Sequence, residues 1–283
     1  SGVLLREVKG QMLLNELLVQ LKNFGFKAFD GSFKLDTSFN LKQAKPIVGM
    51  NMEITNMNTQ KMVESQMSFA KNAVSGIVSS KVNMGGTGLN RPEINNNWKG
   101  SGQFNIKNAR FSSLDIGRQI KTGLIDKLPE IVKGKIKISD KLVDWKGEYE
   151  TLDAKFNLNN GTLNMAELTG KAVPNKGMDL KGSGNISIID YSMDVNADFI
   201  DRYTMLGSQM PKDKRYGVGA ISARIKGTMF SPAFDWAYTL EHLAKNALTD
   251  TVKEKATNAV KEKLKNIVPA DAAKGLFKGL FGK

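Results

Sequence analysis

Hydrophobic and polar residues alternate through long stretches of the chain. The alternation is clearest at positions 33–41, 48–54, 152–158, 178–188 and 191–199. A period of two is typical of β-strands that have one apolar and one polar face. The pattern therefore predicts a mainly β fold: a strongly curved, largely antiparallel meander sheet whose apolar face forms a groove.

The predicted apolar face is rich in Phe and in Met, whose flexible thioether adapts to varied partners. A single sheet needs something to cover such a face, and the helices predicted below are too small to cover a sheet of this length. Acyl chains of a lipid are therefore the candidate cover, and an ordinary protein core is the alternative. The candidate groove residues are Phe33, Leu35, Phe39, Met50, Met52, Ile54, Phe104, Leu152, Phe156, Leu158, Met193, Val195 and Phe199.

Glycine positions predict turns and bends. Asn160-Gly161 separates two alternating stretches and is typical of a two-residue hairpin turn, because both positions need a positive φ. A motif of an apolar residue, Lys and Gly recurs, and longer copies of it stand at 99–106 and 181–188. Such glycines favour bulges and a steeply coiled sheet, unless they only mark strand starts. The glycine-rich segment 85–97 predicts an exposed loop.

Helical spacing divides the rest of the chain. We expect one sheet domain over residues 1–239, with short helical insertions near 59–70 and 113–128. An apolar stripe with a period of 3.6 predicts an amphipathic helix over 240–268, which Pro269 ends.

The predicted tail, 269–283, combines apolar and basic residues. If it is helical, its Leu and Phe residues share one face, with Lys beside them, as in interfacial membrane anchors. Docking on the apolar rim of the domain itself is the alternative. The membrane-contact candidates are Lys274, Leu276, Phe277, Lys278, Leu280 and Phe281.

The residues that carry chemistry are nearly absent from the sequence. There is no Cys, and the one His, His242, has no second His with which to bind a metal. No motif of a metalloprotease, an α/β-hydrolase, a P-loop or a Rossmann site is present. We therefore expect no enzymatic activity, no metal site and no cofactor.

The net charge of +13 predicts an anionic partner or a well-solvated surface. Lys greatly outnumbers Arg, and Arg is the residue suited to reading phosphates and base edges. No basic patch is interleaved with stacking aromatics. We therefore expect anionic lipid headgroups at a membrane surface, and not nucleic acid, as the partner. No apolar stretch reaches the length of about 18 residues that a membrane-spanning helix needs.

An ordered set of short motifs resembles the C-terminal region of the AsmA family. Each motif is weak alone, but the order covers nearly the whole chain. The motifs are the segments 29–35, 54–58, 74–76, 98–102, 108–111, 114–117, 152–161, 180–184, 225–232 and 275–282.

The resemblance implies a Gram-negative envelope protein that projects into the periplasm. It also implies an inner-membrane anchor through an N-terminal helix that this chain does not contain, and kinship with bridge-like lipid transfer proteins. The leading hypothesis is a lipid-binding and transfer module for outer-membrane lipid homeostasis, with phospholipid or another acyl lipid as ligand. A structural or chaperone module for outer-membrane protein assembly, with envelope proteins as partners, is the alternative. Salt-dependent binding of DNA would indicate a third function, through bulk charge.

Overall fold

The computed structural model describes residues 3–66, 74–111, 115–127, 138–208, 210, 212–228 and 231–247. The described helices are few and short. They are α1 (Thr59–Gln66), α2 (Arg91–Asn97), α3 (Ile116–Lys127), α5 (Lys141–Asp144) and α6 (Trp236–Ala247).

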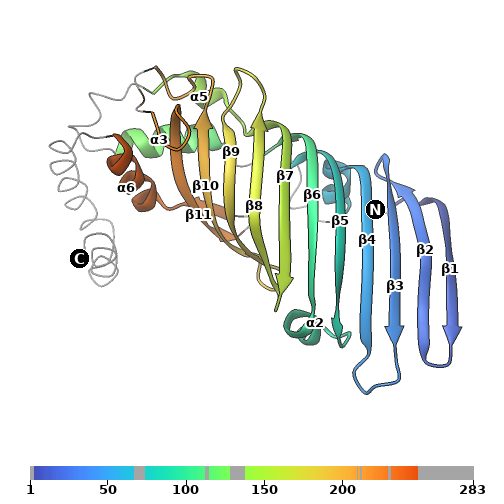
Figure 1. Ribbon diagram of the computed structural model, residues 1–283. Helices are drawn as coiled ribbons and strands as arrows, with labels where there is room; N and C mark the ends of the chain where they lie inside the picture. The colour runs from blue at the N-terminus through green and yellow to red at the C-terminus, as the bar shows by residue number, and fades with distance from the viewer. Residues whose placement is uncertain are drawn as a thin grey trace, which may run out of the picture.

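One antiparallel sheet of twelve strands makes up most of the protein, and the strands lie side by side in sequence order (Figure 1). The sheet is not closed, because β1 and β12 form its two edges. The prediction of a mainly β, antiparallel meander is confirmed. The strands are β1 (Arg6–Asn15), β2 (Leu18–Ala28), β3 (Gly31–Asn40), β4 (Ile47–Asn58), β5 (Ser75–Thr87), β6 (Lys99–Arg110), β7 (Glu148–Asn159), β8 (Thr162–Ala172), β9 (Asp179–Ser187), β10 (Ser192–Asp201), β11 (Gly219–Thr228) and β12 (Ser231–Phe234).

The connections follow local turn chemistry. Asn160 and Gly161 join β7 to β8 with φ of 48° and 69°, which is the hairpin that the sequence predicts. The prediction of a loop over 85–97 is wrong: β5 continues to Thr87, and 91–97 form α2. The helix begins there because the side chain of Asn90 accepts a hydrogen bond from the Glu93 amide and a proline stands in the first turn.

The other helices lie near the predicted places. α1 and α3 fall within the insertions predicted near 59–70 and 113–128, although residues 67–73, 112–114 and 128–137 are outside the described part. α6 begins at Trp236, four positions before the predicted 240, and is described as far as Ala247. The predicted remainder of that helix and the tail, with its membrane-contact candidates, lie outside the described residues.

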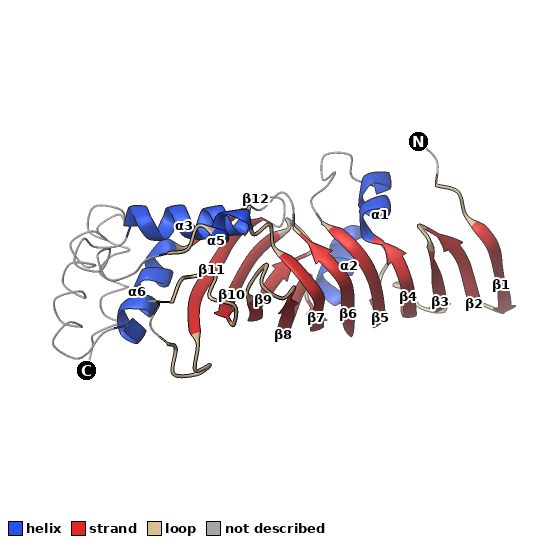
Figure 2. Cartoon of the chain, turned by 90° about the horizontal axis from the view of Figure 1, so that it is seen from above, coloured by secondary structure: helices blue, strands red, loops and turns tan. Residues whose placement is uncertain are grey.

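Among the described residues, a compact cluster of buried apolar side chains lies at the C-terminal end of the sheet. There α3, α5 and α6 lie beside β10 and β11 (Figures 1 and 2). Ile120 of α3, Leu142 of α5 and Leu243 of α6 pack in one cluster with Phe199 of β10 and Ile221 of β11. Trp145 packs edge-on against Phe199, with ring centroids 5.8 Å apart.

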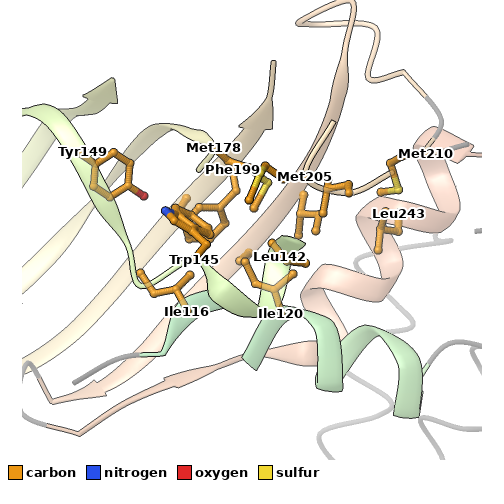
Figure 3. Close-up of a cluster of buried hydrophobic side chains, with 14 of the residues drawn as sticks. Ile116, Ile120, Leu142, Trp145, Tyr149, Met178, Phe199, Met205, Met210 and Leu243 are labelled. Carbon is orange, nitrogen blue, oxygen red and sulfur yellow. The ribbon is translucent and has the colours of Figure 1, made fainter. Parts of the chain in front are cut away.

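Two donors are buried in this core, Trp145 Nε1 and Tyr149 Oη, and neither has a hydrogen-bond partner among the described residues. Burial, with a smaller effect of Asp179, raises the pKa of the Tyr149 phenol, so Tyr149 is neutral at physiological pH. Figure 3 shows Trp145 beside Phe199 in the middle of the cluster and Tyr149 on β7 at its side. Their rings therefore act as apolar filling in this core.

The core generates a first prediction. Ile120→Ala removes a side chain with no exposed surface from α3, and the resulting cavity is expected to lower the free energy of unfolding by about 2–5 kcal/mol. Met12→Ala, on the exposed strand β1, is the matched control and is expected to change it by about 0.5 kcal/mol or less. Urea denaturation followed by circular dichroism measures both. An equal, small effect of the two variants would contradict the assignment of the core to this end.

Candidate functional site

Every candidate groove residue lies on one face of the sheet. Residues directly opposite each other in neighbouring strands point to the same side, so the register assigns the face. One cross-strand row runs without a break from β2 to β12. It contains Phe24, Leu35, Met52, Val82, Gly102, Phe156, Met165, Gly184, Val195, Ile225 and Phe234.

Parallel rows on both sides of this one carry the remaining candidates. Phe33, Ile54 and Phe104 belong to one of them, and Met50, Leu158 and Met193 to another. Phe39, Leu152 and Phe199 stand in the outer rows. We call the face that carries these rows the apolar face. The sequence-based list missed further members of it, Phe24, Phe26, Val82 and Met84, although the spacing of two between them was a usable signal.

Glycines on the apolar face make room for large neighbours. Gly102 stands opposite Phe156, and a Cβ at Gly102 would lie 2.5 Å from Cζ of that ring. The recurrent segments 99–106 and 181–188 form the first part of β6 and most of β9, and each places its glycines on this face. The repeat therefore has a packing reason: it alternates space and bulk across neighbouring strands.

The burial of the apolar face changes along the sheet. Phe199 and Leu152 belong to the helix-covered core, and Leu158 and Val195 are buried as well. The other candidates are half-buried. Among the described helices, α1 contacts β4 and β5, α2 contacts β5, and α6 contacts β11. The structure thus assigns some candidates to a core and leaves Phe33, Leu35 and Met52 partly open to their surroundings.

Aromatic side chains gather at the open end. Phe26 of β2 stacks on Phe33 of β3 with ring centroids 4.8 Å apart, and Phe24 meets Phe26 edge-on at 6.0 Å. All are half-buried. They form a partly exposed aromatic patch on the apolar face, remote in sequence from the core.

The opposite face is polar and hollowed. A hollow of about 730 Å³ crosses β3 to β8, lined by side chains such as Lys34, Asn51, Lys81 and Lys155. Neighbouring Lys and Glu alternate there, as in the ion pair of Lys81 with Glu53 at 3.3 Å. This hollow belongs to the polar face, and the prediction of an apolar groove stays a prediction.

A hydrogen-bond network closes the C-terminal end of the polar face. Arg215, from the β10–β11 connection, donates to Asp198 at 2.8 Å and to Asp213 at 2.8 Å. The Tyr216 hydroxyl donates a hydrogen bond to Asp198 at 2.7 Å. The guanidinium carbon of Arg215 lies 4.9 Å from the centroid of the Tyr216 ring. Burial, with the bond to Asp198, raises the pKa of Tyr216 to about 12. The network holds the β10–β11 connection against β10.

The side chain of His242 contacts its own helix, α6. Its ring stacks on Tyr238 with centroids 4.0 Å apart, and Nδ1 lies 2.9 Å from the carbonyl oxygen of Tyr238, one turn earlier in α6. No group of three or more acidic or His side chains in the described residues is arranged to hold a metal ion.

Comparisons of this chain with family models, with curated proteins and with solved structures found no match. The described helices include none with the length and apolarity that a bilayer crossing requires.

The Arg215 network generates a second prediction. The hydrogen bond from Arg215 is the main cause that holds the pKa of Asp213 below its ordinary value of 3.8. A depressed pKa stabilises the fold above the ordinary pKa, and this stabilisation disappears as the pH falls through the lowered value. Arg215→Met is expected to lower the free energy of unfolding by about 1–3 kcal/mol at neutral pH, because Asp213 is buried and loses a charged partner.

The difference between the parent protein and Arg215→Met is expected to shrink in acid, which urea melts at several pH values measure. Arg202→Met is the matched control, since Arg202 pairs with Asp179 at 2.7 Å outside this network. A difference that grows as the pH falls would contradict the assignment.

Proposed function

We propose that this protein is a lipid-binding and transfer module that holds acyl chains against its apolar face. The observation that carries the proposal is the unbroken apolar row from β2 to β12, whose last members, Ile225 and Phe234, pack against the core of α3, α5 and α6. A half-buried row of Phe, Met and Leu favours a long apolar ligand, because each buried methylene contributes about 0.8 kcal/mol.

The cellular setting of the proposal rests on the resemblance to the AsmA family. We propose the periplasm as the location, an N-terminal helix outside this chain as the inner-membrane anchor, and outer-membrane lipid homeostasis as the role. Phospholipid is the proposed ligand, and the net charge of +13 favours anionic headgroups. The protein is proposed to act without catalysis, cofactor or nucleic acid.

A second function, binding of polypeptide during outer-membrane protein assembly, is favoured by one observation. All ten residues of β1 are exposed, and its outer edge pairs with no strand among the described residues. Such an edge offers free backbone groups to another strand. Mass spectrometry of material that co-purifies with the protein separates the two functions: the first predicts lipid, the second peptide.

The third prediction tests the apolar face with a pair of neighbouring variants. Phe156→Asp places a charge among half-buried apolar side chains in the middle of the row, where an unpaired charge is costly. Asn157→Asp adds the same charge on the polar face, one residue away. Co-purified lipid per protein, measured by mass spectrometry, is expected to fall several-fold in Phe156→Asp and to stay unchanged in Asn157→Asp.

Circular dichroism spectra must match the parent protein for both variants. Phe199→Asp is unsuitable for this purpose, because Phe199 is 2% exposed and belongs to the core. Equal lipid content in folded Phe156→Asp and in the parent protein would contradict the lipid proposal.

A further inference from the structure

Strand β1 forms one edge of the sheet and exposes apolar side chains on the apolar face. Met12 and Leu14 are 73% and 69% exposed, although Leu21 and Val19, which stand opposite them on β2, are half-buried. The apolar face therefore continues onto an edge strand that no described residue covers from the outside. Most of the exposed large hydrophobic residues in the described part of the chain belong to β1 and its flanks: Leu4, Leu5, Val8, Met12, Leu13, Leu14 and Leu17.

Leu13 makes the opposite face of β1 apolar as well. It stands opposite Gln20, in a cross-strand row that continues with Ser38 and Gly49 on the polar face. Leu13 is 46% exposed there. Exposed apolar residues on both faces of an edge strand favour pairing with another strand.

Only the first half of β1 has the features that keep sheet edges from pairing. Register shifts lie between Arg6 and Lys9 and between Lys9 and Gln11, and Glu7 has a φ of 50°. Bulges and charged side chains of this kind protect an edge. From Gln11 to Asn15 the register with β2 is regular, and this segment contains no charged residue and no proline. It is therefore the part of the edge that offers regularly spaced backbone donors and acceptors.

The segment Gln11–Asn15 is complementary to a second copy of itself. Its order of side-chain types is amide, apolar, apolar, apolar, amide, and this order is the same in both directions. In an antiparallel pair centred on Leu13, the Leu13 side chains of the two copies face each other. Met12 of each copy then faces Leu14 of the other, and the amides face amides. Side chains directly opposite each other interact most closely, and this register opposes neither like charges nor an apolar residue with a polar one.

We propose that this protein forms a two-fold symmetric dimer in which the β1 strands of two copies pair antiparallel along Gln11–Asn15. Such pairing extends the hydrogen-bonded ladder of the sheet, and both strands are already ordered by β2, so little conformational entropy is lost. A foreign strand would need only the free backbone groups, whereas the palindromic order of side chains matches the same strand.

The dimer would lengthen the apolar face. The register pairs residues of the same face, so the two-fold axis passes through Leu13 perpendicular to the sheet. The apolar faces of both copies therefore lie on the same side and continue into each other. The inference does not depend on whether this face holds lipid.

Disulfide cross-linking tests the register. The chain has no Cys, and directly opposed residues of an antiparallel pair have Cα atoms about 4.5–5.5 Å apart, which a disulfide spans. Leu13→Cys alone is expected to form a cross-linked dimer under mild oxidation. Met12→Cys and Leu14→Cys are expected to cross-link several-fold more when mixed than either does alone. Val8→Cys, exposed on the same strand, is the matched control and is expected to stay monomeric, because its two copies would lie about 30 Å apart.

Sedimentation velocity measures the association without oxidation. The paired segment is short and the interface small, so the sedimentation coefficient of the parent protein is expected to rise with protein concentration toward that of a dimer. Leu13→Lys places two like charges opposite each other and is expected to weaken the association about tenfold or more. Leu4→Lys, at an exposed position before β1, is expected to associate like the parent, and circular dichroism checks that both variants are folded.

Three results would overturn the proposal. The first is a parent protein that stays monomeric at every concentration. The second is a dimer that Leu13→Lys leaves intact, or no more cross-linking in Leu13→Cys than in Val8→Cys, since another surface would then form the dimer. The third is a co-purified peptide, identified by mass spectrometry, that Leu13→Lys releases, because the edge would then belong to a foreign polypeptide. Lipid content measured in the same samples reports separately on the apolar face.

Discussion

The structure depends on the register of its antiparallel pairs. A slip of one residue between two strands would move every side chain of a strand to the other face. The odd spacings in the sequence are absorbed by bulges: Leu21 and Phe24 are three positions apart, as are Ile54 and Met57, and a register shift lies between each pair. The left-handed residues Asn23 and Asn56, with φ of 52° and 50°, stand at these bulges. Asn tolerates that conformation, so the bulges keep apolar residues on one face.

The apolar face continues along the whole sheet, so its residues lie in two different environments. At the C-terminal end the residues around Phe199 and Ile221 are covered by helices and contribute as an ordinary core does. Toward β2 and β3 the same rows are half-buried and lie away from the helical cluster. The sheet is a single hydrogen-bonded unit, so the packed end supports the open end through the strand ladder. An open apolar surface can therefore persist without a core of its own beneath it.

Much of this could be predicted from the sequence, because a period of two reports faces directly. The shared face of Leu35, Met52, Phe156 and Val195 follows from alternation, and the β7–β8 hairpin follows from Asn160-Gly161. Alternation does not report bulges, since a bulge depends on what the partner strand offers. The register shift between Leu21 and Phe24 is such a feature, since alternation alone would place these two residues on opposite faces.

Longer-range features needed the structure for a different reason. Segment 85–97 is rich in Gly and Asn, which local propensity assigns to a loop, yet the Asn90 cap and pairing with β4 and β6 make it strand and helix. The pairing of Arg215 with Asp198, seventeen positions earlier, depends on the path of a long connection. The hollow on the polar face arises from the three-dimensional shape of the sheet, and a twisted sheet can be hollowed on either side.

A long open row of apolar side chains favours one kind of ligand. Compact ligands gain affinity when a cavity buries most of their surface. The hollow that crosses β3 to β8 is open, and its lining alternates charged residues such as Lys34 and Lys81 with residues of the central row such as Leu35 and Val82. A long flexible chain lying along a row buries one side over its whole length, so its binding energy grows with length.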